Sequence, residues 1–475
     1  MLIRHSLIYV AARFLPALLG LATTVVLTHM LLPAGYGVYG LALVIMNFGS
    51  DVAFDWLGIS LMRFYQTRGD HPAFKGTIVV LYLGLVGLTA LAAGLAWLAG
   101  LFAGGNRYVL SVGILLMCTY SCFELASRFE IAAFRPSRYL MMNLGRGIFS
   151  FAGAVGAAWL TANPIWTAAG LSAGMIIGAA LGGPAGGPVT LKAFDWPLAR
   201  SVLSFGLPIA GSMLAASTAF NGTRWLIQQL DSLQALGFFT AAYLLAQSNL
   251  SLIGEGVASA GYSLAVRALE KGDQKAARDQ LRANCSLLLA LLAPASLGLA
   301  LTAHGLAATF LGAQYVTPVT RIVPWVAIGA GLFSFRANYF DHAFQLGRRP
   351  YLQIWVSVAA ALIAIGVSVW LIPHFGPVGA AIALIVAMIL SCALALILSR
   401  YAFPLPFPWD QALRVAGACA AMTIAVIAVP ATLPASFVVQ VVLGAIVYAL
   451  AGLTLNVLNA RQHLKALLSV GKASL

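Results

Sequence analysis

Apolar runs of roughly 20 residues recur from one end of this chain to the other, and each could cross about 30 Å of hydrocarbon as a helix. Of the 475 residues, 61% are hydrophobic and only 8% are charged, whereas a soluble domain carries about 25% charged residues. This composition excludes a soluble globular protein. The period-two alternation of a membrane β-barrel is absent. The sequence therefore predicts an all-α, polytopic integral membrane protein.

We predict about fourteen transmembrane helices from the lengths of the apolar runs. The first run, preceded by Arg4, is too long for a signal-peptide core and lacks a small-residue cleavage site, so we interpret it as a retained helix. The predicted spans are 6–31, 37–62, 76–103, 108–130, 139–161, 164–183, 200–224, 236–265, 282–303, 319–340, 352–373, 376–399, 411–430 and 436–458.

The 27 Lys and Arg residues, against 13 Asp and Glu, fall mainly in alternate connections. Cytoplasmic loops collect Lys and Arg, so the excess indicates topology rather than nucleic-acid binding. It places both termini in the cytoplasm, which requires an even number of spans. The five cysteines lie inside apolar segments without metal-like grouping. We therefore expect no metal and no cofactor.

Two sets of short matches indicate an internal repeat. Ala34–Tyr39 aligns with Gln234–Phe239, and Ser137–Tyr139 enters its span as Arg349–Tyr351 enters a later one. Six spans per unit keep both units in one orientation, which predicts a parallel repeat about an axis along the membrane normal. We expect two six-helix bundles forming a V-shaped transporter, plus two extra C-terminal helices. The predicted parts are an N-terminal bundle (1–190), a second bundle (191–400), and an extra transmembrane pair with a cytoplasmic tail (401–475).

Four arginines interrupt the apolar segments and are our candidate substrate-binding residues. An arginine within the bilayer is costly even on lenient scales, and a guanidinium fork suits diphosphate oxygens. Structural pairing is the alternative for each, and it is favoured for Arg336, which lies near Asp341. One arginine lies on the first span of each half, where a shared water-filled cleft is expected. The candidates are Arg13, Arg146, Arg224 and Arg336.

Four acidic residues also lie within the predicted spans: Asp51, Asp55, Glu124 and Glu255. Carboxylates in a membrane should face a protein interior or water, because exposure to lipid is costly. They are candidates for coupling a proton or sodium ion to transport. Each could equally be the structural partner of an arginine.

No enzymatic constellation is present. The sequence has no HExxH motif, no nucleophile elbow and no long outer loop with paired carboxylates. A membrane glycan polymerase or ligase would need a sizeable outer loop, whereas the longest outer connection, 304–317, is short and nearly uncharged. We therefore expect a protein that is not an enzyme.

Between Arg267 and Arg282, basic residues recur at helical spacing. This pattern predicts a single basic stripe on a cytoplasmic helix that lies on anionic lipid. Recruitment of a synthesis enzyme is the alternative, with a polysaccharide polymerase or glycosyltransferases as the partners.

Several motifs together resemble the Wzx-type flippases, the polysaccharide transporter branch of the multidrug/oligosaccharidyl-lipid/polysaccharide exporter superfamily. The motifs are Leu31–Gly40, Asp55–Gly58 running to Arg63-Phe64, Leu236–Phe239 and Phe375–Ala381. The resemblance covers nearly the whole chain. Family members often have Asp-Arg in the seventh span, where this chain has Thr223-Arg224.

The resemblance implies a flippase of the bacterial inner membrane, active in cell-surface polysaccharide biosynthesis and export. It would move undecaprenyl-diphosphate-linked oligosaccharide from the cytoplasmic to the periplasmic leaflet by alternating access. Its partners would be this lipid-linked substrate and membrane lipids, with no nucleic acid. Two relatives of the same superfamily remain alternatives: a lipid II flippase, and a multidrug or cation antiporter with a cavity dominated by carboxylates.

Overall fold

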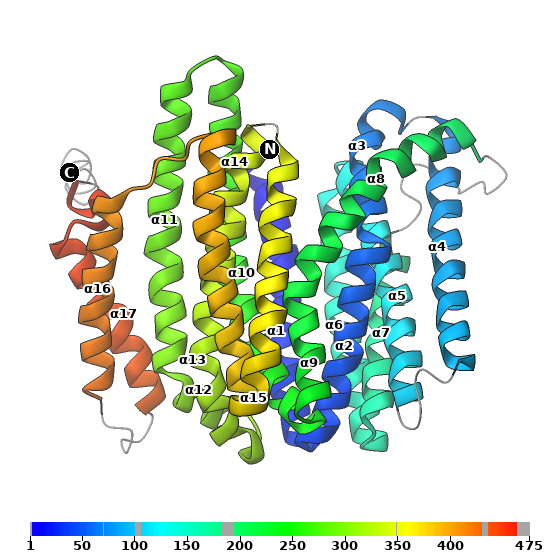
Figure 1. The fold of residues 1–475 in the computed structure, drawn as a ribbon, viewed down its shortest axis with the longest axis horizontal. Helices are drawn as coiled ribbons and strands as arrows, with labels where there is room; N and C mark the ends of the chain where they lie inside the picture. The colour runs from blue at the N-terminus through cyan, green and yellow to red at the C-terminus, as the bar shows by residue number, and fades with distance from the viewer. Residues whose placement is uncertain are drawn as a thin grey trace. The chain divides into compact units, whose positions relative to one another are not determined.

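The computed structural model describes residues 2–69, 71–99, 106–182, 194–347, 349–429 and 436–462. These residues form helices and no strand (Figure 1), so the predicted all-α class is confirmed. The elements are α1 Leu2–Met30, α2 Pro33–Ala53, α3 Asp55–Arg68, α4 Pro72–Leu98, α5 Asn106–Ala132, α6 Pro136–Thr161, α7 Pro164–Gly182, α8 Trp196–Ser217, η1 Thr218–Gly222, α9 Thr223–Leu230, α10 Leu233–Glu270, α11 Gln274–Leu301, α12 Ala303–Phe310, α13 Ala313–Phe335, η2 Arg336–Phe340, α14 Asp341–Leu346, α15 Pro350–Ala402, α16 Trp409–Ile427, α17 Ser436–Thr454 and η3 Val457–Asn459.

Among the described residues, ten helices are long and apolar enough to cross a membrane, or eleven if the bent pair α2–α3 is one span. In the part of the chain that the structure describes, each predicted span lies largely on one helix or on consecutive helices. The spans 352–373 and 376–399 both lie in α15, which is interrupted at Gly376. Gly376 has φ +57°, a left-handed conformation that glycine adopts without a steric cost. The chain is thus a multi-pass membrane protein.

The chain packs into two compact units. Unit 1 comprises Met1–Ala241 and Ala361–Ala380, and unit 2 comprises Ala242–Ala360 and Ala381–Leu475. The predicted parts 1–190, 191–400 and 401–475 follow sequence repetition rather than packing, and they stay a prediction.

Helix α2 does not continue straight into α3. The two helices meet at Phe54, whose φ and ψ of −123° and −30° are not helical, and they are bent by 42°. The break falls inside the predicted span 37–62. It places Asp51 at the end of α2 and Asp55 at the start of α3. The helix dipole of α3 favours the negative charge of Asp55, because that residue lies at the helix N-terminus.

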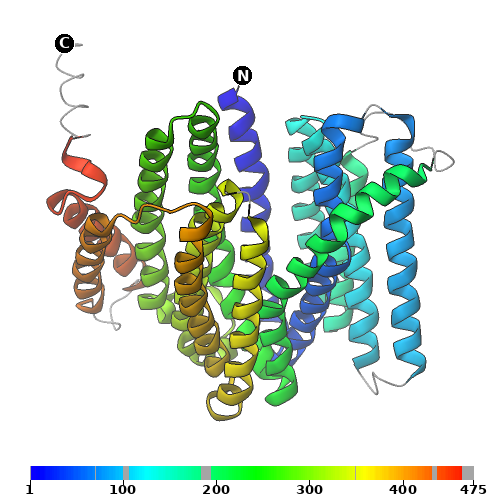
Figure 2. The same cartoon turned by 45° about the horizontal axis from the view of Figure 1, so that its top comes forward.

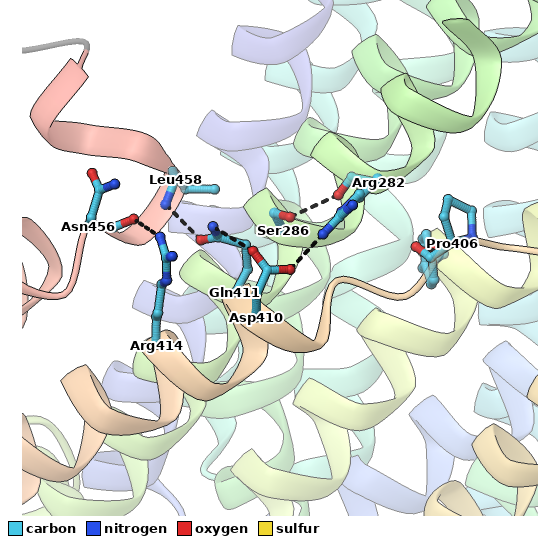
Figure 3. Close-up of polar contacts among 9 residues, drawn as sticks. Arg282, Ser286, Pro406, Asp410, Gln411, Arg414, Asn456 and Leu458 are labelled. Carbon is cyan, nitrogen blue, oxygen red and sulfur yellow. Dashed lines mark hydrogen bonds and ion pairs between the residues drawn. The ribbon is translucent and has the colours of Figure 1, made fainter. Parts of the chain in front are cut away.

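In unit 2, polar contacts join α11 to α16, and α16 to the segment that follows α17 (Figure 3). The Arg282 guanidinium donates to Asp410 at 2.7 Å, and Arg414 donates to the Asn456 carbonyl at 2.9 Å. The hydroxyl of Tyr448 on α17 donates to the Ala290 carbonyl of α11 at 2.7 Å. Helices α16 and α17 lie side by side in both views (Figure 1 and Figure 2).

The basic segment between Arg267 and Arg282 does not form the single surface helix that its spacing predicts. Helix α10 ends at Glu270 and α11 begins at Gln274. Gly272 turns the chain with φ +78°, and the Asp273 carboxylate accepts from the Ala276 N–H at 2.9 Å, capping α11. The prediction of one basic stripe on lipid is therefore wrong, because Gly272-Asp273 acts as a turn and cap.

Candidate functional site

A cavity of about 120 Å³ lies inside unit 1 at the break between α2 and α3. Four charged residues line it: Asp51, Asp55, Glu124 and Arg128. A polar space of this size has room for several water molecules. The other lining residues are Ser50, Phe54, Leu57, Gly58, Tyr82, Tyr120, Ser121 and Leu125.

Arg128 on α5 holds the start of α3 through two contacts with one residue. Its Nη2 pairs with the Asp55 carboxylate, and its Nη1 donates to the Asp55 carbonyl at 3.0 Å. Its Nε also lies 3.9 Å from Oε2 of Glu124, one helical turn earlier. The guanidinium therefore pairs with two carboxylates from different helices, Asp55 of α3 and Glu124 of α5. Hydrogen bonds between charged groups are stronger than those between neutral groups.

Gly58 provides the space that Arg128 occupies. A Cβ added at Gly58 would lie within 3 Å of the Arg128 side chain, on both its methylene stem and its guanidinium. Asp55 and Gly58, two of the motif residues in Asp55–Gly58, thus have complementary roles. The carboxylate pairs with the arginine, and the missing side chain lets it approach.

Asp51 is held by hydrogen bonds from residues at and near η1. The Ser217 hydroxyl donates to Oδ2 of Asp51 at 2.6 Å, and Nδ2 of Asn221 donates to the Ser217 hydroxyl at 2.9 Å. Asn221 belongs to η1, a single π-helical turn. Such turns are rare and occur frequently at functional sites.

Arg146 on α6 lies against the same helix that carries Glu124 and Arg128. Its guanidinium carbon is 4.9 Å from the centre of the Phe123 ring, within the range of a cation–π contact. Tyr120 interacts electrostatically with both Glu124 and Arg146. The cavity and Arg146 thus belong to one polar region around α5.

The structure brings together three of the four predicted carboxylates. Asp51, Asp55 and Glu124 line one cavity, in keeping with the expectation that they face a protein interior or water. Glu255 is exposed on α10 in unit 2. The coupling of an ion by these residues stays a prediction. The described residues contain no group of His, Cys, Asp and Glu arranged to hold a metal ion.

The candidate arginines have different environments. Arg336 is 4% exposed and its Nη1 lies 3.7 Å from Oδ1 of Asp341, so the predicted pairing is confirmed. Arg224 on α9 is 2% exposed and interacts electrostatically with Tyr36. Arg13 lies in α1, but its side chain is outside the described part of the chain. Substrate contact by the four arginines stays a prediction.

Sequence reasoning missed Arg128, Ser217 and Asn221. Arg128 lies inside the predicted span 108–130 and follows Glu124 by four residues, the spacing of an ion pair on one helix face. That spacing could have identified it. Ser217 and Asn221 gave no comparable signal, because their role depends on the π-helical turn.

Comparison with known proteins identifies relatives of the whole fold. The sequence model of a family described as polysaccharide biosynthesis protein matches residues 26–320. No curated protein sequence matches the chain.

Solved structures of several transporters are similar. The lipid II flippase MurJ, in an inward closed conformation, matches over 96% of this chain and 99% of its own, with TM-score 0.74 and 13% identity. An inward-facing MATE family multidrug resistance transporter of the MOP superfamily matches over 81% of this chain and 94% of its own, with TM-score 0.58 and 13% identity. A MOP superfamily transporter from Pyrococcus furiosus matches over 84% and 94%, with TM-score 0.54 and 14% identity. At these identities the likeness establishes the fold.

Proposed function

The chain belongs to the polysaccharide biosynthesis protein family, and from this premise we propose that it is a flippase for undecaprenyl-diphosphate-linked oligosaccharide. It moves this substrate from the cytoplasmic to the periplasmic leaflet of the bacterial inner membrane by alternating access. Both of its termini are cytoplasmic, as the distribution of Lys and Arg favours. The product supplies cell-surface polysaccharide biosynthesis, with a polymerase and glycosyltransferases as protein partners.

Physical chemistry supports the need for such a carrier. Sugars and a diphosphate lose their hydration in hydrocarbon at a large free-energy cost, so the head group does not cross unaided. A carrier must offer polar groups at membrane depth while the lipid tail stays in the bilayer. The observation that carries the proposal is the match of residues 26–320 to the polysaccharide biosynthesis protein family, on a fold similar to that of a lipid II flippase.

The Asp55–Arg128 ion pair could exchange its partners during transport. An arginine bound by exchangeable carboxylates can release them for a phosphate, or the carboxylates can take up a cation as the arginine moves. Both side chains are partly exposed, at 16% for Arg128 and 27% for Asp55. The ion pair lies at the bend between α2 and α3, so breaking it would allow the angle between the two helices to change.

Two other functions of the same superfamily are the alternatives. The likeness to MurJ, with TM-score 0.74, favours a lipid-linked substrate and keeps lipid II as the second candidate. The likeness to a MATE family transporter, with TM-score 0.58, together with the three carboxylates of the cavity, keeps a drug or cation antiporter as the third. No covalent bond changes in any of these, and the substrate would be recovered unaltered.

Reconstitution into proteoliposomes tests the proposal. Lipid-linked oligosaccharide placed in one leaflet is assayed for accessibility to a lectin outside, in parallel with lipid II and with a cationic dye. Translocation of the oligosaccharide lipid by the wild-type protein, and its loss in the Arg128→Ala variant, is the expected result. Translocation of lipid II or dye alone would overturn the assignment.

A further inference from the structure

Unit 1 contains a second charged cluster at the ends of three helices. Lys75 lies in the first turn of α4, Glu130 lies near the end of α5, and Arg135 and Arg138 flank the first residues of α6. The Glu130 carboxylate interacts electrostatically with all three basic residues. This cluster shares no residue with the cavity at the α2–α3 break.

The charges of this cluster do not satisfy one another. Glu130 is 1% exposed, and in the described part of the chain neither of its carboxylate oxygens has a hydrogen-bond partner. The buried Nζ of Lys75 also lacks a partner among these residues. Such unsatisfied buried groups are rare, and an ion, water or ligand commonly accounts for them.

The excess charge of the cluster is positive. Three basic residues against one carboxylate leave a formal charge of 3 − 1 = +2. The first turns of α4 and α6, helices of 27 and 26 residues, add the partial positive charge of their N-termini. A bound phosphate would supply negative charge to balance this excess and a hydrogen-bond acceptor for the Lys75 ammonium, which lacks a partner among the described residues.

The neighbouring surface is apolar, which points to a lipid rather than a soluble anion. Phe134, between Glu130 and Arg135 in the chain, is 75% exposed. An exposed aromatic side chain next to basic residues suits the membrane–water interface, where the ring meets lipid and the cations meet head groups. The sequence places this connection on the cytoplasmic side.

We propose that Lys75, Arg135 and Arg138 form a binding site for the phosphate group of a lipid in the cytoplasmic leaflet. Nη1 of Arg138 donates to the Gly182 carbonyl at 3.4 Å, which orients this side chain at the start of α6. Two lipids carry the required chemistry: an anionic glycerophospholipid and the diphosphate of the lipid-linked substrate. This proposal needs the protein to lie in a membrane, but it does not depend on either lipid being transported.

Native mass spectrometry of the full-length protein, with three probes, tests this site. The probes are phosphatidylglycerol, undecaprenyl diphosphate and inorganic phosphate. Retention of phosphatidylglycerol assigns the site to a glycerophospholipid, and retention of undecaprenyl diphosphate alone assigns it to the substrate lipid. Either result supports the proposal. Equal binding of inorganic phosphate would overturn the lipid assignment, and retention of no probe would overturn the site.

Variants distinguish this site from a structural charge cluster. Lys75→Met and Arg135→Gln should each weaken lipid binding about fivefold, since one basic residue near a membrane surface contributes about 1 kcal/mol. Arg200→Gln, which removes an exposed basic residue from α8, is the matched control and should change nothing.

The Glu130→Gln variant distinguishes a lipid-binding site from a cluster of charges that only stabilises the fold. Removing the negative charge should strengthen phosphate binding several-fold, because the carboxylate competes with the lipid for the three cations. A melting temperature measured in lipid-free detergent shows whether each variant is folded. Unchanged binding in folded Lys75→Met and Arg135→Gln variants, or weaker binding in folded Glu130→Gln, would overturn the proposal. Because the readout is binding, it is independent of flippase activity.

Discussion

Gly37 and Gly237 make reciprocal contacts between the first turns of α2 and α10. A Cβ at Gly37 would overlap the backbone carbonyl of Leu233, and a Cβ at Gly237 would overlap that of Pro33. Both contacts lie inside unit 1. The two glycines, like Pro33 and Leu233, are separated in the chain by 237 − 37 = 200 residues.

This reciprocity has a geometric meaning. When residue i contacts the equivalent of j, and j contacts the equivalent of i, the contact is isologous and a two-fold axis passes through it. The contacting segments are the matched sequences Ala34–Tyr39 and Gln234–Phe239. The contact is that of two matched segments related by a local two-fold axis between Gly37 and Gly237. The direction of the axis, and with it the parallel repeat, stays a prediction.

The first prediction concerns this glycine contact. Gly37→Ala or Gly237→Ala should destabilise the protein by about 1–3 kcal/mol, because the added methyl meets backbone that cannot rotate away. Thermal unfolding in detergent measures the effect. Gly84→Ala in α4, where a Cβ would meet nothing within 4 Å, is the control and should not destabilise. Equal melting temperatures for Gly37→Ala and Gly84→Ala would contradict the contact.

The second prediction concerns the Asp55–Arg128 pair. Arg128→Gln leaves three carboxylates around one cavity without their cation, and breaking a buried pair costs up to about 3–5 kcal/mol, with less expected here since both groups are partly exposed. We expect lower stability and loss of transport. The double variant Asp55→Asn, Arg128→Gln should recover part of the stability, which a double-mutant cycle measures. Additive effects would mean that the two residues act independently.

The third prediction concerns ion coupling at Asp51. Asp51→Asn keeps an acceptor for the Ser217 hydroxyl, which donates at 2.6 Å, but removes the charge. We expect stimulation of transport by an imposed proton or sodium gradient to disappear, while slow exchange without a gradient continues. Flux in proteoliposomes with each gradient measures this. Asp195→Asn, at the N-cap of α8, is the control carboxylate. Full stimulation of Asp51→Asn would assign Asp51 a purely structural role.

The carboxylates of the cavity show what the sequence could predict. Asp51, Asp55 and Glu124 stand out because their residue type conflicts with an apolar span, and the structure places them together. Their partners did not stand out. Arg128 was assigned to a span by hydropathy, and its contact with Asp55 depends on a long-range approach that Gly58 permits.

The helical class and the positions of the spans were predictable because hydropathy and length determine them. The local breaks were less visible. Phe54 leaves the helical conformation without a proline or glycine, so no residue in the sequence signals the α2–α3 bend. By contrast, Gly272-Asp273 is a recognisable turn and cap. These two residues predict a helix break that the regular spacing of the basic residues around them does not.

The fourth prediction is the topology. In a variant lacking the five native cysteines, Ala34→Cys should react with a membrane-impermeant thiol reagent added from the periplasm, and Lys271→Cys should not. Both positions are exposed in the structure, so a difference in labelling would reflect the side of the membrane and not burial within the protein. The reason is the positive-inside distribution of Lys and Arg. Labelling at position 271 but not at 34 would reverse the orientation.

The last prediction concerns the two arginines on the first span of each predicted half, Arg13 and Arg224. We expect both to contact the substrate diphosphate from a water-filled cleft. Arg224 is the second residue after the π-helical turn η1, which ends at Gly222, and such turns occur frequently at functional sites. In this structure Arg224 is 2% exposed, so substrate contact requires a state in which α9 has moved.

Replacing either arginine with alanine should abolish export while the protein still inserts, and lysine should restore it only in part, because the bidentate fork is lost. The measurement is accumulation of lipid-linked oligosaccharide on the cytoplasmic face of cells that carry each variant. Arg200→Ala is the control, since this arginine is exposed on α8 and is not a candidate for substrate contact; it should leave export unchanged. Normal export by the double variant Arg13→Ala, Arg224→Ala would refute the assignment, as would a structure with bound substrate in which neither side chain reaches the diphosphate.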